Sequence, residues 1–168
     1  MEQTAAELFR RHHLAVYRHL RRMTGRGDVA EDLTQDVFVR VVSALPTYDA
    51  RDRELPWLFR IARNVFLNHV RSLSRHPEAP AAPEADWPSD DAHQLLGAAL
   101  REALGRLTAP DREVLLLREQ GGLSYAEIAR ACGMTDAAVR SRIYRAKCAL
   151  RLELKPELEA VRRGASGR

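Results

Sequence analysis

Leu123–Leu150, LSYAEIARACGMTDAAVRSRIYRAKCAL, has the pattern of two short helices joined by a tight turn. Ser124 and Glu127 are three residues apart, which predicts a capping box at the start of the first helix. Gly133 then supplies a residue that tolerates positive φ in the turn. Thr135 is placed to cap the second helix, and Asp136 in its first turn is favoured by the helix dipole. The stretch therefore predicts a helix-turn-helix.

The second helix of this motif has an apolar face and a different, basic face. The apolar positions recur at helical spacing and are expected to face inward: Val139, Ile143, Ala146 and Leu150. The opposite side carries Ala137, Arg140, Ser141 and Tyr144. Small residues near the start allow close approach to a major groove, and arginine or serine further along suits bases and phosphates. The pattern favours DNA binding, while a basic solvated helix in a bundle remains the alternative.

Composition limits the remaining classes of function. The 168 residues include 27 basic and 23 acidic ones, for a net charge of +4, and arginine supplies 25 of the 27. Two cysteines, Cys132 and Cys148, are too few for a zinc site or a disulfide framework, and the histidines form no ligand pattern. We therefore expect no metal, no cofactor and no catalytic residues. No apolar run reaches membrane-spanning length and no signal peptide opens the chain, so we expect no membrane insertion and a cytoplasmic protein.

A change in composition divides the chain into two modules. Residues 76–93, HPEAPAAPEADWPSDDAH, hold four prolines and five acids without lysine or arginine, which predicts an extended linker. Residues 1–75 and 94–155 each carry a net charge of +4, the linker −5, and the tail 156–168 +1. The fold class predicted is all-α, with two small basic helical domains joined by an acidic linker.

Three helices are expected in the N-terminal module, over about 5–23, 28–45 and 57–73. Asp28 is expected to cap the second helix, and Pro56 to stand at the first position of the third after a polar loop over 46–55. The second helix has an apolar stripe with four-residue spacing, namely Val29, Leu33, Val37, Val41 and Leu45. Four polar residues lie largely off this stripe: Asp32, Gln35, Asp36 and Arg40.

The third helix, WLFRIARNVFLNHVRS, combines a core face with a basic polar side. The expected core is Leu58, Ile61, Ala62, Val65 and Val70. The polar side, flanked by Trp57 and Phe59, contains Arg60, Arg63, Asn64, Asn68 and Arg71. Arginine and asparagine beside aromatic rings suit unstacked nucleic acid, through phosphate contacts and base stacking. Each aromatic taken alone is expected to be a core residue.

Four helices are expected in the C-terminal module. The first runs from about Leu95 to Leu107, and Thr108 is placed to cap the second, which Gly121 and Gly122 end before the helix-turn-helix. The expected core is Leu104, Leu107, Val114, Leu115, Leu117 and Ile128.

Taken in order, these motifs resemble those of sigma-70-type RNA polymerase sigma factors of the small extracytoplasmic-function (ECF) group. AEDLTQDVFVRV is similar to sigma region 2.2, and WLFRIARNVFLNHVRS to regions 2.3–2.4. The stretch from LTAPDREV to RAKCALR is similar to region 4. The resemblance covers about residues 5–155 and implies a region 2 bundle of three or four helices and a region 4 domain of four helices.

The resemblance also implies a role for each group of polar residues. Asp32, Gln35, Asp36 and Arg40 would bind the β′ clamp helices of core RNA polymerase, and region 4 would contact the β flap. The −10 promoter element would be captured and melted by the loop 46–55 and the third helix, through Trp57, Arg60, Arg63, Asn64, Asn68 and Arg71. The −35 element would be read by Thr135, Asp136, Ala137, Ala138, Arg140, Ser141, Tyr144 and Arg145. Members of the family are commonly held by an anti-sigma factor, so such a partner is expected beside polymerase and promoter DNA.

Two other classes of protein compete with this interpretation. A stand-alone helix-turn-helix regulator would bind duplex operators without polymerase, and its N-terminal module would sense or dimerise. A nucleic-acid-processing enzyme is disfavoured, because the sequence contains no metal-binding acid cluster, P-loop or nucleophile–base pair.

Overall fold

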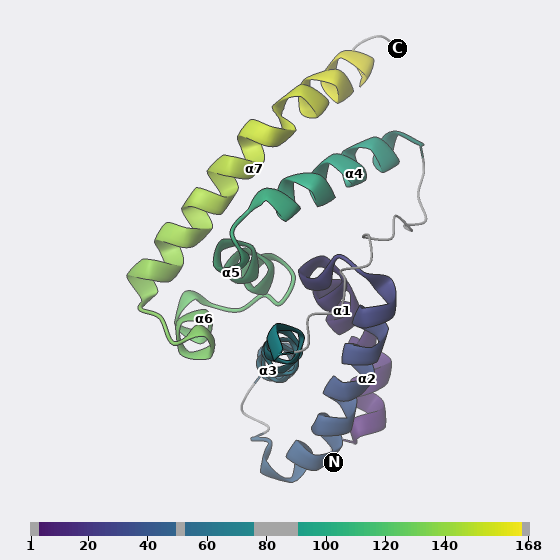
Figure 1. Ribbon diagram of the computed structural model, residues 1–168, viewed down its shortest axis with the longest axis vertical. Helices are drawn as coiled ribbons and strands as arrows, with labels where there is room; N and C mark the ends of the chain where they lie inside the picture. Colours follow the sequence, from purple (N-terminus) through teal and green to yellow (C-terminus); the bar gives the residue numbers. More distant parts are fainter. Residues whose placement is uncertain (1–3, 50–52, 76–90, 166–168) are drawn as a thin grey trace.

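The computed structural model describes residues 4–49, 53–75 and 91–165 (Figure 1). Its described part contains α-helices, one short 3-10 helix and no strand. The elements are α1 (Ala5–Thr24), α2 (Gly27–Ala44), η1 (Leu45–Thr47), α3 (Glu54–Arg75), α4 (Asp91–Arg106), α5 (Ala109–Glu119), α6 (Tyr125–Cys132) and α7 (Asp136–Ala165). The predicted all-α class is confirmed. A linker was expected over 76–93. Residues 76–90 lie outside the described residues, and α4 begins at Asp91, so positions 91–93 are helical.

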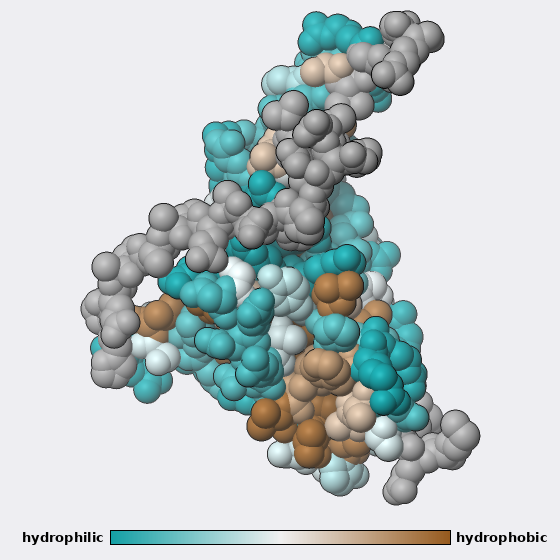
Figure 2. Space-filling view, turned by 90° about the vertical axis from the view of Figure 1, so that its right-hand side faces the viewer, coloured by the Kyte–Doolittle hydropathy of each residue, from teal (hydrophilic) through white to brown (hydrophobic). Residues whose placement is uncertain are grey.

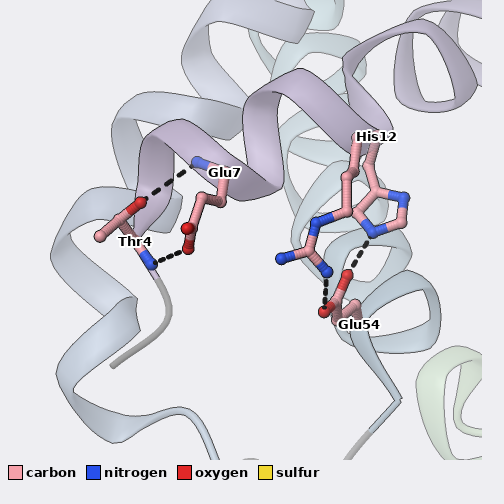
Figure 3. Close-up of polar contacts among 5 residues, drawn as sticks. Thr4, Glu7, His12 and Glu54 are labelled. Carbon is pink, nitrogen blue, oxygen red and sulfur yellow. Dashed lines mark hydrogen bonds and ion pairs between the residues drawn. The ribbon is translucent and has the colours of Figure 1, made fainter. Parts of the chain in front are cut away.

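The N-terminal module consists of α1, α2 and α3, which pack against one another around one apolar core. The expected stripe of α2 supplies its centre: Leu33, Val37 and Val41 are buried, and Val29 and Leu45 pack at the edge. A capping box between Thr4 and Glu7 starts α1 (Figure 3). One turn further on, Arg11 Nη1 lies 2.7 Å from Glu54 Oε1, and His12 contacts the other oxygen of the same carboxylate. These contacts fix the start of α3 on α1.

The C-terminal module consists of α4 to α7, with α7 packed against α4, α5 and α6. Its buried cluster confirms the expected core, with Leu107 at its edge. The helix-turn-helix has the predicted local structure. Ser124 and Glu127 form the capping box, Gly133 ends α6 with φ of 64°, and the backbone N–H of Ala138 donates to Thr135 Oγ1 at 3.2 Å. Val139, Ile143 and Ala146 of α7 are buried as expected.

Several helix boundaries differ from the prediction. Arg26, in extended conformation after the left-handed Gly25, caps α2, so Asp28 lies in the first turn and pairs with Arg26. The third helix begins at Glu54, which makes Pro56 its third residue; a first-turn position needs no intrahelical N–H bond. Val70 was expected in the core but is 40% exposed, because the last turn and a half of α3, residues 70–75, is exposed throughout. Finally, α7 continues through Pro156 to Ala165, where a tail was expected.

No helix in the described ranges has the length and apolar character needed to cross a membrane.

Candidate nucleic-acid interface

The polar residues predicted on α2 form one exposed face. Asp32, Gln35, Asp36 and Arg40 are all exposed. Val39 and Val42, which the sequence analysis did not select, lie among them with 66% and 61% of their surface exposed. Figure 2 looks at the side formed by α1 and α2 and shows apolar side chains gathered over its lower part. The sequence could have pointed to these two valines, because they lie off the core stripe of an amphipathic helix. A solvated face seldom holds two exposed valines close together.

The residues predicted on the polar side of α3 fall into two groups. Arg60, Asn64, Asn68 and Arg71 are exposed, and Arg71 Nη1 donates to Asn68 Oδ1 at 3.2 Å. By contrast, Trp57 is only 8% exposed and packs against Tyr48, with ring centroids 4.7 Å apart. Arg63 is also largely covered, because its Nε lies 2.7 Å from Glu113 Oε1 of α5. The structure thus separates the predicted set into an exposed strip and two covered side chains.

Arg63 belongs to a contact between the two modules, which we call the module interface: Arg53, Phe59 and Arg63 against Glu113, Gly121, Gly122 and Glu127. Arg53 Nη2 donates to the Gly122 carbonyl at 2.9 Å and lies 3.0 Å from Glu127 Oε2. Phe59 is fully buried and belongs to the apolar cluster of the C-terminal module, although α3 belongs to the N-terminal one. A Cβ at Gly121 would lie 3.1 Å from Phe59 Cδ1 and 2.7 Å from the Leu117 carbonyl oxygen, so only glycine fits there.

The ionisable groups at this interface have shifted pKa values. Burial raises the pKa of Glu113, although the guanidinium of Arg63 acts in the opposite direction. Burial also raises the pKa of the Cys132 thiol, on which Glu113 and Arg63 exert opposite electrostatic effects. On the α1 side, His19 packs against Phe59, and burial, with a smaller contribution from Arg22, lowers its pKa to about 3. The Phe59 ring of the interface therefore packs against a neutral histidine.

The predicted residues at the start of α7 are almost all exposed. Only Ala138 is half-buried among Thr135, Asp136, Ala137, Ala138, Arg140, Ser141, Tyr144 and Arg145. The guanidinium of Arg140 lies over the ring of Tyr125 in α6, 5.4 Å from its centroid, and this contact restrains it. An arginine restrained in this way loses less conformational freedom when it binds a base or phosphate.

Asp111 of α5 sets the position of α7. Its Oδ1 accepts hydrogen bonds from Arg142 Nη1 at 2.9 Å and from Arg145 Nη2 at 3.3 Å. Burial by itself would raise the pKa of Asp111, but the hydrogen bonds from these two arginines outweigh it and lower the pKa. Arg145, predicted to contact DNA, therefore also joins α7 to α5.

Three consecutive residues of α5 contact three different helices. Asp111 accepts hydrogen bonds from α7, Glu113 forms an ion pair with Arg63 of α3, and Arg112 Nη2 lies 3.5 Å from the carbonyl oxygen of Met23 in α1. The sequence analysis selected neither Glu113 nor Phe59 for a role between the modules. The sequence offered only a weak signal for them, an acid directly before the apolar run of α5 and an aromatic beside an arginine.

Comparison with known proteins gives the family. The sigma-70 region 2 model matches residues 8–76, and the sigma-70 region 4 model matches residues 97–150. The RNA polymerase sigma factor CarQ of Myxococcus xanthus is 36% identical, over 91% of this chain and 90% of its own length. The ECF RNA polymerase sigma factor SigC of Mycobacterium tuberculosis is 34% identical, over 76% of this chain and 71% of its own.

Two solved structures share the fold over most of both chains. The sigma factor RpoE from Bartonella quintana, solved in complex with the anti-sigma factor NepR, superposes with a TM-score of 0.72 at 27% identity, over 88% of this chain and 94% of that one. CnrH, solved with the cytosolic domain of CnrY, gives 0.65 at 30% identity, over 90% and 88%. The chain therefore belongs to the sigma-70 family, in its ECF group, and is a promoter-specificity sigma factor of RNA polymerase.

Proposed function

We propose that the two modules divide the work of promoter recognition as follows. The N-terminal module, residues 1–75, binds core polymerase through α2 and the −10 element through α3. The C-terminal module, residues 94–155, reads the −35 element through the start of α7, and residues 76–93 connect them. The observation that carries the proposal is the exposure of two separate predicted surfaces, on α2 and on α7, in a chain that matches both sigma regions.

The face of α2 is the proposed site for the β′ clamp helices. Asp32, Gln35, Asp36 and Arg40 supply polar contacts, and Val39 and Val42 add about two-thirds of their surface as apolar contact area. A surface that combines exposed apolar and polar side chains resembles a specific protein interface. The C-terminal module would add a second contact, to the β flap.

The proposed −10 site is the exposed strip of α3: Arg60, Asn64, Asn68 and Arg71, joined by Trp57 and Arg63 once these become accessible. Melting needs no covalent chemistry from the protein. Unstacking costs a few kcal/mol per base, and stacking and phosphate contacts return about 1–3 kcal/mol per base. We therefore propose a non-enzymatic role, in the cytoplasm where core polymerase transcribes.

At the −35 element, Ala137 and Ala138 would let α7 approach the major groove, while Arg140, Ser141, Tyr144 and Arg145 contact bases or phosphates. Thr135 and Asp136 stand at the N-terminus of the helix, where the hydroxyl and the carboxylate can contact base edges. We also propose an anti-sigma partner, because the RpoE and CnrH structures are complexes with NepR and with CnrY.

The test is reconstituted transcription. The full chain is mixed with sigma-free core polymerase and a library of promoter fragments, and transcripts are mapped. The proposal expects specific initiation that depends on the protein. Transcription that never depends on it would contradict the proposal, and duplex binding without polymerase would favour a stand-alone regulator.

A further inference from the structure

We propose that Tyr125 is a positioning residue that determines specificity at the −35 element. Its ring holds the guanidinium of Arg140 in place across the helix-turn-helix, without a carboxylate that would occupy the N–H donors of the arginine. Tyr125 is the first residue of α6, and Arg140 lies in the second turn of α7. The inference rests on the proposed function, since it concerns how an arginine assigned to the −35 element is aimed.

The ring of Tyr125 is itself firmly held. It is half-buried and packs against the apolar cluster of the C-terminal module. The guanidinium of Arg118 in α5 also lies over this ring, 5.0 Å from its centroid, and Arg118 Nη1 donates to the Leu123 carbonyl at 2.8 Å. Because Leu123 is fully buried, Arg118 and the ring are both tied to the core of the module. The ring is therefore a fixed support for Arg140.

Two neighbouring arginines of α7 are held in a different way. Arg142 and Arg145 both donate to Asp111 Oδ1, so part of their hydrogen-bonding capacity is used within the protein. Arg140 has no ion pair within the part of the chain that the structure describes. Its contact is with the ring of Tyr125, whose quadrupole attracts the cation without a carboxylate. The guanidinium of Arg140 is thus restrained and still able to donate to DNA.

This restraint matters because Arg140 is exposed. Immobilising a long, mobile side chain on binding lowers the affinity about two- to twelvefold, and a side chain that is already restrained avoids part of this loss. A bidentate contact with a base also requires the planar guanidinium in one orientation. An arginine without the ring keeps its charge and can meet phosphates of any sequence. Loss of the Tyr125 ring should therefore reduce sequence discrimination as well as affinity.

The test uses the full chain assembled with core polymerase and measures the dissociation constant for promoter DNA. Tyr125→Leu removes the ring but keeps an apolar side chain at the edge of the core, and it should weaken binding to the preferred promoter about fivefold. The loss should be smaller on a promoter changed at the base pair where Arg140→Ala abolishes discrimination. Tyr125→Phe is the matched control, because it keeps the ring without the hydroxyl, and it should stay within about twofold of wild type.

A double-variant cycle separates positioning from a general role in packing. In the Arg140→Ala background the ring has no guanidinium to hold, so the addition of Tyr125→Leu should change promoter affinity by less than about twofold. A side chain that only stabilises the module would cause the same loss in both backgrounds.

The restraint can also be measured without DNA. In the free full chain, NMR relaxation of the Arg140 Nε–H group reports the motion of the guanidinium, and the signal is identified by its absence from Arg140→Ala. This group should be rigid in wild type and Tyr125→Phe, and mobile in Tyr125→Leu. If Tyr125→Leu does not fold by circular dichroism, Tyr125→Met replaces it, because methionine adapts to irregular space in a core.

Three results would each overturn the inference: equal losses in Tyr125→Phe and Tyr125→Leu, equal losses in the two Arg140 backgrounds, or a guanidinium whose motion is the same without the ring. Failure of the proposed function is seen separately, because Arg140→Ala would then bind the promoter as tightly as wild type does. That result removes the −35 role of Arg140 and the inference together. A loss with Arg140→Ala but none with Tyr125→Leu removes the positioning role of Tyr125 alone.

Discussion

The imidazole of His19 packs edge-on against the ring of Phe59, with 4.8 Å between the ring centroids. His19 comes from α1 and Phe59 from α3; both are buried, and Phe59 belongs to the apolar cluster of the C-terminal module. Nδ1 of His19 has no hydrogen-bond partner among the described residues. With its pKa lowered to about 3, the imidazole is neutral near pH 7, so this contact depends on the proton staying off the ring.

Acidification should therefore weaken the native structure through His19. The native pKa of about 3 lies below the ordinary value of 6.5, so the stability is fully present above pH 6.5 and is lost progressively as the pH falls toward 3. Between pH 7 and pH 5 we expect the free energy of unfolding to fall by about 2 kcal/mol from this residue, at 1.36 kcal/mol per pH unit. Urea unfolding at pH 7, 6 and 5 measures the change.

The control for this prediction is His19→Leu, which keeps an apolar side chain against Phe59 and removes the proton site. Carboxylates titrate in both proteins, and Glu113, whose pKa is raised, acts with the opposite sign to His19. The informative quantity is thus the difference between wild type and variant. Equal pH dependence in the two proteins would contradict the assignment.

The face of α2 can be tested by charge reversal. Asp36→Arg places a cation on the surface proposed for the β′ clamp helices and should weaken binding to core polymerase at least tenfold without unfolding the chain, because Asp36 is exposed. The matched control is Glu31→Arg, an exposed acid of α2 about 140° away around the helix. Affinity for core is measured by fluorescence anisotropy. The same loss in both variants would indicate a general effect of charge, not this face.

Arg140 should contribute to sequence reading at the −35 element. Arg140→Ala is expected to cost about 1–3 kcal/mol of affinity for the preferred duplex if the guanidinium contacts a base. Arg151→Ala removes an exposed arginine further along α7 and serves as the control. Binding is measured on the preferred duplex and on variants at single base pairs. A loss of equal size on every sequence would assign Arg140 to a phosphate.

Phe59 should stabilise a module other than its own. Phe59→Ala removes a fully buried ring, a change that costs about 3–5 kcal/mol in protein cores, and should speed amide hydrogen exchange in α5 and α6. Phe66→Ala is the control, because Phe66 lies on the same helix and packs against the core of the N-terminal module. It should affect α1 and α2 instead. Unchanged exchange in α5 and α6 of Phe59→Ala would show that the ring stabilises only its own module.

Local signals in the sequence predicted the elements well. The Ser124–Glu127 capping box, the left-handed Gly133 and the Thr108 cap act over three or four residues, so their outcome depends little on the rest of the chain. The stripe of α2 was equally readable, because its spacing alone defines a buried face. Asp28 shows the limit of this approach: the helix could be capped by Asp28 or by Arg26 two residues earlier, and the extended backbone of Arg26 decided the start.

The contact between the modules could not be predicted in this way. The sequence around Phe59 and Arg63 is compatible with a helix that faces solvent, DNA or another module. Only the three-dimensional placement of α5 distinguishes these cases. The role of Glu113 likewise depends on a partner far away in the sequence. The assignment of individual side chains to polymerase and promoter stays a prediction that the variants above test.

The three consecutive residues Asp111, Arg112 and Glu113 have one further consequence. They join α7, α1 and α3 to a single short helix, α5. A shift of α5 therefore changes the surroundings of α7, proposed for the −35 element, and of α3, proposed for the −10 element, together. Thermodynamic linkage makes such coupling reciprocal. If DNA at α7 favours release of Arg63, then a strand bound at α3 must tighten binding at α7 by the same factor, so the two promoter elements would be recognised cooperatively through three neighbouring side chains.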